Sequence, residues 1–300
     1  MITLSAGEAS VVLAPEAGGA VLGWRIGRQP LLRATDPTAL LRGRGRGMGA
    51  FPLVPFSNRI AGGRFAFGGR EYRLARADTS FPIPIHGLGW VRPWQLAAVS
   101  ERAADLRLVH PATEADRALW PFAFAADLRV ALTATTLSIG LRLVNRHDGP
   151  APAGLGLHPF FPRTAAASLR FAATGVWRAT PERLPTVHVP VPPEWDHRAG
   201  LKIGTVALDD VFTGWDGRAE VTLAPVAPVS EPVTITLTAS PIFRHLVIYT
   251  PPGAGYFCVE PVSHMTDAIH HLADRTDTGL AVLAPGGALE GEIGFAVRGA

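Results

Sequence analysis

The sequence predicts an all-β protein whose strands form a large antiparallel β-sandwich. Through most of the chain, apolar and polar residues alternate with a period of two, in segments that glycine and proline separate. The 32 glycines and 27 prolines among 300 residues suit many tight turns between short strands. Patterns typical of long amphipathic helices are missing, and residues 267–272 fit at most a turn or two of helix.

Taken in order, the alternation predicts strands at 21–26, 128–132, 137–144, 233–238, 246–249 and 256–259. Residues 181–195 are rich in proline and valine, so we expect them to run extended over the surface. No change of composition and no linker divides the chain. We therefore expect residues 1–300 to form a single domain, because large sandwiches often reach this size as one unit.

The charge of the chain does not indicate nucleic acid as a partner. The formal net charge is +3, and the basic residues are arginines except for Lys202. These arginines are scattered, whereas a nucleic-acid site needs a clustered stripe or a recognisable motif. The Arg-Gly tract at 42–47 is the exception, but without interleaved aromatic residues it predicts a solvated loop rather than an RNA contact.

A single cysteine, Cys258, excludes an intramolecular disulfide and any site built from several cysteines. This usage fits a reducing compartment. The N-terminus has no basic segment followed by an apolar run, and no window approaches the roughly 18 apolar residues of a membrane helix. We therefore expect a cytoplasmic protein without a membrane partner, present as a monomer or a homodimer.

Residues 154–161, Gly-Leu-Gly-Leu-His-Pro-Phe-Phe, place a titratable side chain beside two glycines. In a strand, alternation puts the two leucines on the core face and the glycines with His158 on the other. Glycine inside a strand often marks the close approach of a ligand or another backbone. We expect Pro159 to end the strand and the two phenylalanines to wall the space. His158 is then a candidate general acid or base, the alternative being a buried histidine bonded to a loop.

The predicted strand at 256–259 delivers a carboxylate in a similar way. Alternation places Phe257 and Val259 on the core face and Glu260 on the other, where we expect Pro261 to end the strand. A carboxylate at the rim of an apolar strand can be a general base once partial burial raises its pKa. The alternative is an exposed glutamate at a strand end. Glu260 is nevertheless the strongest candidate partner for a histidine in the 154–161 stretch.

Two glycine-rich turns carry further polar side chains. Asn58 and Arg59 stand at the start of a predicted hairpin and carry donors suited to hydroxyl oxygens, unless the arginine forms a surface ion pair. His86 lies in a turn beside Trp90 and Trp94. Flat aromatic faces next to a polar turn are typical of a sugar site, although tryptophans are more often part of a core.

Adjacent carboxylates at Asp209 and Asp210 would point in opposite directions on a strand, so one of them would face a pocket. The alternative is a turn formed by the pair. Metal binding is not predicted, because no HExxH motif or cysteine pair occurs and the adjacent His270 and His271 do not share a helix face. The chain also has no GxGxxG, phosphate-binding or nucleophile-elbow motif. We expect no cofactor and no serine hydrolysis.

Together and in this order, the segments resemble the aldose 1-epimerase (galactose mutarotase) family. The resembling pieces are Asn58-Arg59-Ile60 with Gly62-Gly63-Arg64-Phe65, His86-Gly87 leading to Trp94, His158-Pro159-Phe160-Phe161, Asp209-Asp210-Val211-Phe212, Cys258-Val259-Glu260-Pro261 and Leu283-Ala284-Pro285-Gly286-Gly287. The resemblance runs from about residue 49 to the C-terminus. It implies a large antiparallel β-sandwich with an open cleft for a monosaccharide.

The resemblance implies an isomerase that interconverts the α and β anomers of a free aldose without a cofactor. His158 would be the general acid that protonates the ring oxygen, and Glu260 the general base that takes the proton of the anomeric hydroxyl. Asp209 matches the family better than Asp210, because it keeps the spacing of three residues to the phenylalanine. The residues implied to hold the sugar are Arg59, His86, Asp209 and, more weakly matched, Asn58.

Leu88 and Pro159 depart from the family's galactose enzymes, which carry a glycine and a serine there, so the resemblance leaves the sugar open. Two other functions are compatible with the same scaffold. A sugar-binding module without turnover would have lost a catalytic group, whereas this chain keeps both. Epimerisation of a hexose 6-phosphate would require extra cationic groups at the cleft, for which the arginines at 42–46 are candidates.

Overall fold

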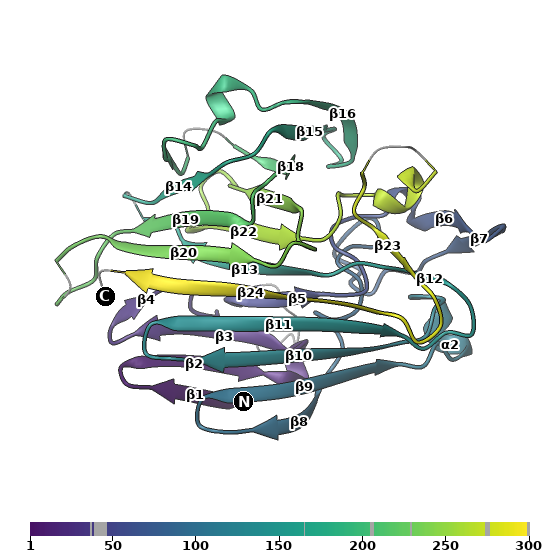
Figure 1. The fold of residues 1–300 in the computed structure, drawn as a ribbon, viewed down its shortest axis with the longest axis horizontal. Coiled ribbons are helices and arrows are strands. Elements are labelled where there is room, and N and C mark those ends of the chain that lie inside the picture. The colour runs from purple at the N-terminus through teal and green to yellow at the C-terminus, as the bar shows by residue number, and fades with distance from the viewer. Residues whose placement is uncertain are drawn as a thin grey trace.

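The computed structural model describes residues 1–36, 38, 47–164, 166–204, 207–228, 230–273 and 277–298. The arginines predicted at 42–46 to form a solvated loop lie outside these residues. Within them, two large sheets and two two-stranded sheets account for the strands, which pair antiparallel throughout. The predicted all-β class with a large antiparallel sandwich is confirmed (Figure 1).

The larger sheet contains, in spatial order, β1 (Ile2–Ala6), β2 (Ala9–Ala14), β3 (Ala20–Ile26), β5 (Ala50–Leu53), β13 (Gly156–Pro162), β22 (Tyr256–Val262), β21 (His245–Tyr249), β18 (Asp209–Thr213), β15 (Gly175–Ala179) and β16 (Pro185–Pro190), with β4 (Gln29–Pro30) beside β3. The second sheet contains β17 (Leu201–Lys202), β14 (Ser168–Phe171), β19 (Arg218–Leu223), β20 (Val233–Ala239), β24 (Ala288–Arg298), β11 (Thr136–Asn145), β10 (Phe124–Leu132), β9 (Ala103–His110) and β8 (Gln95–Val99). In Figure 1, β24, β11 and β10 lie in front of β13, β5 and β3.

The remaining elements are short. The hairpin β6 (Arg64–Phe67) and β7 (Arg70–Arg73) forms one two-stranded sheet, and β12 (Ala151–Ala153) pairs with the distant β23 (Ala281–Leu283) in the other. The helical turns are η1 (Pro15–Ala17), η2 (Ala61–Gly63), α2 (Glu114–Arg117), η3 (Pro193–Trp195) and η4 (Ala268–His271). Each predicted strand coincides with an observed one, and η4 matches the turn of helix expected at 267–272. The expected surface excursion at 181–195 includes β16, an exposed edge strand of the larger sheet.

The main core lies between the two sheets and follows from the alternation in their strands. On β10, Leu128 and Val130 are buried while Arg129 between them is exposed and pairs with Asp105 of β9. The same rule holds along β9 and β11, whose alternate residues are buried. Because one face of the second sheet is covered and the other meets water, its strands show the period of two that the sequence displays.

The central strands of the larger sheet are buried on both faces. On β13, Leu157 and Phe161 join the core between the sheets, whereas Phe160 packs into a second apolar cluster on the opposite face. On β22, Val259 faces the first core and Cys258 the second cluster. The predicted assignment of residues to the two faces of these strands is therefore confirmed, and the second face is free to build a site.

The prediction that the prolines beside His158 and Glu260 end their strands is wrong. Pro159 lies inside β13 and pairs with β5, and Pro261 lies inside β22 and pairs with β21. The prolines interrupt the pairing of β13 with β22. The paired residues there are Gly156 with Val262 and then Phe160 with Cys258, and no residue between them is paired across these two strands. Proline has no N–H to donate, so the ladder is open over this interval.

The glycines of the 154–161 stretch do not clear space for a ligand, and this expectation was wrong. A Cβ on Gly154 would lie 2.1 Å from the His264 ring, and one on Gly156 would lie 2.8 Å from Val262. Both glycines therefore admit neighbouring protein side chains. The expected pair of phenylalanine walls is also wrong, because Phe161 faces the core between the sheets.

Candidate active site

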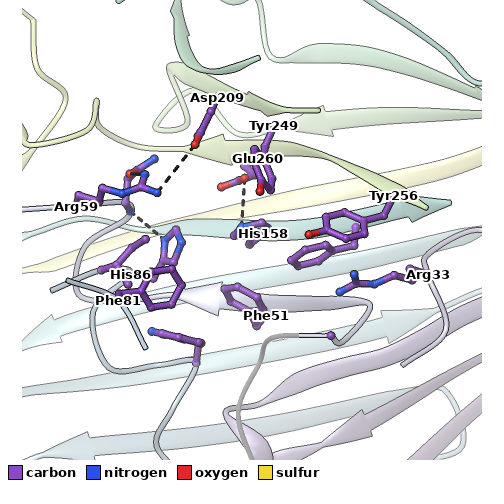
Figure 2. Close-up of a pocket in the computed structure, with 15 residues that line it drawn as sticks. Arg33, Phe51, Arg59, Phe81, His86, His158, Asp209, Tyr249, Tyr256 and Glu260 are labelled. Atoms are coloured by element: carbon purple, nitrogen blue, oxygen red, sulfur yellow. Dashed lines mark hydrogen bonds and ion pairs between the residues drawn. The ribbon is translucent and has the colours of Figure 1, made fainter. Parts of the chain in front are cut away.

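A pocket lies on the face of the larger sheet that is turned away from the second sheet. Its floor is formed by adjacent strands β5, β13, β22, β21 and β18, and the segments around residues 58 and 86 close one end. All six residues predicted from the sequence line it, namely Asn58, Arg59, His86, His158, Asp209 and Glu260 (Figure 2). Side chains from segments up to about two hundred residues apart in the chain thus meet in one place.

His158 and Glu260 face each other across β13 and β22, within the open interval of the ladder. Their facing atoms, Nε2 and Oε1, are 3.3 Å apart, and the side chains are 9% and 3% exposed. Directly opposed residues on neighbouring antiparallel strands have close Cβ atoms, so the sheet itself sets this contact. The alternative of an exposed glutamate at a strand end is wrong.

Burial shifts the pKa values of both His158 and Glu260 and so determines which of them carries the shared proton. Desolvation raises the pKa of Glu260 well above its ordinary value, with the nearby Asp209 carboxylate adding to the effect. Desolvation and, to a smaller extent, the positive charge of Arg33 together lower the pKa of His158 to about 3. Both shifts favour a neutral carboxylic acid beside a neutral imidazole over a carboxylate beside an imidazolium. The pair holds one proton and one free acceptor.

His86 is fixed by a reciprocal contact with Asn58. Its backbone N–H donates to the Asn58 carbonyl (2.8 Å), and its Nδ1 accepts from the Asn58 N–H (3.1 Å). In a neutral ring with Nδ1 accepting, Nε2 carries the hydrogen. Burial lowers the pKa of His86 well below its usual value, so the ring stays neutral and offers Nε2–H as a donor.

The turn after His86 requires glycine for a visible reason. Gly87 has a φ of +66°, and a Cβ there would lie 2.2 Å from the Val54 carbonyl oxygen. A parallel bridge between Val54 and Gly87 brings these backbones together. The His-Gly pair therefore combines a donor side chain with the one residue type that fits this close approach.

Arg59 and Asp209 occupy one end of the pocket together. Arg59 Nη1 donates to Asn58 Oδ1 at 2.9 Å, and Arg59 Nη2 lies 4.0 Å from Asp209 Oδ2. Arg183, which the sequence did not indicate, lies 3.4 Å from the same carboxylate oxygen through Nε. Asp209 rather than Asp210 lines the pocket, because Asp210 turns away and accepts from the Ala179 N–H at 3.2 Å. Asn58 thus orients Arg59 as well as lining the pocket.

Aromatic rings form much of the remaining wall. Phe160 stacks on His158 with centroids 4.4 Å apart, and the ring of Phe51 lies 4.6 Å from that of His158. Tyr249 lines the pocket with a pKa raised by burial to about 12, so its hydroxyl remains a donor. Trp90 lines the pocket as well, whereas Trp94 belongs to the core. Further lining rings are Phe81 and Tyr256.

Most of these aromatic residues were missed by sequence reasoning. Phe51 and Phe160 lie in strands where any apolar residue fits the pattern, so only the three-dimensional position of the pocket distinguishes them. Arg33 was missed for a similar reason, because it stands among scattered arginines. It lines the pocket on the side away from Arg59 (Figure 2).

Three lining or adjacent groups could hold a metal ion in principle. Ligand-type atoms of His158, Cys258 and Glu260 lie within 4.8 Å of one another. Burial raises the pKa of the Cys258 thiol well above its usual value, so it is protonated, which opposes metal binding. The absence of a metal and of a cofactor stays a prediction. In the part of the chain that the structure describes, no helix has the length and apolar character to cross a membrane.

The fold and the pocket define a class: an antiparallel β-sandwich with a buried histidine–glutamate pair at the base of a polar and aromatic pocket. The family model for aldose 1-epimerase matches residues 1–296, and the chain belongs to this family. It is 29% identical to the uncharacterized protein YphB of Escherichia coli K12 over 303 residues, covering 99% of this chain and 98% of that protein.

Solved structures agree with this assignment. A candidate aldose 1-epimerase from Escherichia coli K12 superposes with a TM-score of 0.85 at 28% identity, covering 99% of this chain and 98% of that one. Galactose 1-epimerase from Lactobacillus acidophilus NCFM has a TM-score of 0.79 at 15% identity, with 99% and 93% covered. At that identity the likeness concerns the fold alone.

Proposed function

We propose that this protein is a cofactor-independent aldose 1-epimerase that interconverts the α and β anomers of a free monosaccharide. The observation that carries the proposal is the contact between His158 Nε2 and Glu260 Oε1, at 3.3 Å, in the floor of a pocket rich in donors. Membership of the family supports the reaction class.

The reaction needs two proton transfers and no change of oxidation state. One group removes the proton of the anomeric hydroxyl while another protonates the ring oxygen, and the ring opens to the aldehyde. Rotation about the C1–C2 bond presents the other face of the carbonyl. The same two groups, with their roles exchanged, close the ring to the other anomer.

The His158–Glu260 pair meets this need because it holds one proton and one free acceptor. In our assignment Glu260 is the base at the anomeric hydroxyl and His158 the acid at the ring oxygen. This direction requires a proton on His158, whereas the pKa shifts favour a proton on Glu260. In the proposed mechanism the proton moves from Glu260 to His158 across the 3.3 Å contact. His86, Arg59 and Asp209 then hold the hydroxyls that fix the ring over the pair.

Glu260→Gln and His158→Gln test the proposal. Each removes one proton-transfer group, so we expect each variant to lose about 100-fold or more of the rate. The measurement is the relaxation of optical rotation of freshly dissolved α-aldoses, checked by NMR exchange between anomers. The control is Glu290→Gln, because Glu290 is 70% exposed on the second sheet. A wild-type protein that accelerates none of a panel of hexoses, pentoses and deoxysugars contradicts the proposal.

A sugar-binding module on the same fold is the competing function. It would bind an aldose without speeding anomer exchange, and Glu260→Gln would leave its affinity largely unchanged. Titration calorimetry beside the rate measurement separates the two functions. The third alternative, a hexose 6-phosphate epimerase, depends on a cationic group at the pocket.

A further inference from the structure

Arg33 is a partly buried cation in the pocket wall whose position the proposed reaction leaves unexplained. Its guanidinium lies 4.1 Å from the ring centroid of Phe160 and 4.3 Å from that of Tyr256. Nη2 donates to the Met48 carbonyl at 2.7 Å, while Nε is buried without a hydrogen-bond partner. The centroids of these two rings are 5.2 Å apart, so the rings do not enclose the guanidinium from opposite faces. A ligand anion would bind the N–H edge of the group, where guanidinium groups bind carboxylates and phosphates.

The charge of Arg33 is balanced less well than that of Arg59. Arg59 shares Asp209 with Arg183 at the opposite end of the pocket. Among the described residues no carboxylate forms an ion pair with Arg33, and Asp36 makes the weakest of the charge contributions to its pKa. Desolvation dominates and lowers that pKa. A partly buried cation of this kind favours an anionic ligand.

Arg33 also lies close to the reacting pair. Phe160 contacts both the Arg33 guanidinium and the His158 imidazole, with centroids of the two rings 4.4 Å apart. In Figure 2, His158 and Glu260 lie between Arg59 on one side and Arg33 on the other. A pyranose whose ring oxygen meets His158 has its exocyclic carbon C6 next to that oxygen, because C5 carries both. If Arg59 and Asp209 bind the other hydroxyls at their end of the pocket, C6 points toward the opposite side, where Arg33 lies.

We propose that the preferred substrate is an aldose with an anionic group, a carboxylate or a phosphate, at C6, and that Arg33 binds this group. The inference rests on the proposed function and names its substrate class. Burial is the main cause of the lowered pKa of His158, and an anion beside Arg33 offsets the second cause, the positive charge of Arg33.

The test compares three substrates that differ at C6: glucose, glucuronate and glucose 6-phosphate, each also in the galactose series. Anomer exchange is followed by NMR for the wild type, Arg33→Gln, Arg33→Lys and the matched control Arg70→Gln, in an exposed hairpin strand. We expect the wild type to favour at least one anionic sugar over its neutral parent by about tenfold or more in kcat/KM. Arg33→Gln should abolish this preference, mainly through KM, and Arg33→Lys should retain part of it.

Added salt should raise KM for the anionic sugar more than for the neutral one. The carboxylate and phosphate arms identify which anion is bound. Equal kcat/KM for neutral and anionic sugars in the wild type, or a preference that survives Arg33→Gln, overturns the inference while the epimerase proposal stands. If no sugar is turned over, the proposed function fails. In that case, or if Arg33→Gln does not fold, the heat stability of Glu260→Gln is measured with each sugar. Stabilisation by glucuronate or glucose 6-phosphate but not by glucose supports the anion site. Equal stabilisation by the anionic sugars and glucose overturns it.

Discussion

The buried Glu260 carboxyl group lowers the stability of the fold at higher pH and is the base of the proposed reaction. Its side chain is 3% exposed, and its pKa in the folded protein is raised well above the ordinary value. Above about pH 4.5 the unfolded chain releases this proton while the folded chain keeps it. Stability is therefore lost as the pH rises from there toward the folded-state pKa.

Glu260→Gln should accordingly stabilise the protein while inactivating it. The amide is nearly isosteric and does not ionise, so the gain in free energy of unfolding should be small near pH 5 and increase toward pH 8. Urea unfolding at both pH values measures it. Glu290→Gln, at an exposed position, should show no such trend. A variant less stable than the wild type at pH 8 would mean that the carboxylate is ionised and well paired in the fold.

Cys258 illustrates what burial does to a reactive group. It is the single cysteine of the chain, fully covered, with a pKa raised well above its usual value. Thiolate is the reactive form, so we expect native protein to resist a disulfide reagent for hours and the urea-unfolded protein to react with one equivalent within minutes. Rapid labelling of the native protein would show that the floor of the pocket opens.

At the scale of elements, the turn 86–87 is the clearest case of geometry imposed by a close approach. Gly87→Ala should destabilise the protein by more than about 2 kcal/mol, because it adds a clash with the Val54 carbonyl to the strain of a positive φ. Gly68→Ala is the matched control. Gly68 also has a positive φ, +57°, but an added Cβ would have no atom within 4 Å, so it should cost only about 1 kcal/mol.

The unfolding midpoint in urea measures both variants. Equal losses would show that backbone strain alone accounts for Gly87. Gly87→Ala should also reduce activity in the folded fraction, because displacement of the turn moves the His86 donor.

Alternation along single strands was sufficient to predict the faces of His158 and Glu260. It could not predict that they oppose each other, because the register between β13 and β22 joins segments about a hundred residues apart and is fixed by tertiary pairing. The prediction that Pro159 and Pro261 end their strands was wrong for the same reason, because pairing with neighbouring strands is not visible in the sequence. Each proline is held within its strand by the neighbour on the other side.

The glycines before His158 show the limit of local reasoning. A missing side chain in a strand indicates that something lies close, but the sequence does not say whether it is a ligand or the protein itself. Here His264 and Val262 fill the space. Arg33 shows the converse, because no local pattern separates a pocket arginine from the scattered surface ones.

At the scale of the whole molecule, several histidines are buried in the neutral form. Desolvation lowers the pKa of His158 to about 3 and those of His245 and His264 to about 4. His264 accepts from the Ser57 N–H through Nε2 at 3.1 Å, so a proton there would break that bond. Below about pH 6.5 the unfolded chain takes up protons at these positions and the folded chain does not.

Stability should therefore fall as the pH drops from about 6.5 toward 4. Three such groups give a limiting slope of about 4 kcal/mol per pH unit, which is large against a typical total of about 5–15 kcal/mol. Because Glu260 acts in the opposite direction, destabilising the fold at higher pH, we expect maximum stability near pH 6 to 7. Urea midpoints measured from pH 4.5 to 8.5 test this, and a midpoint that does not change between pH 7 and 5 would show that these histidines gain protons inside the folded protein.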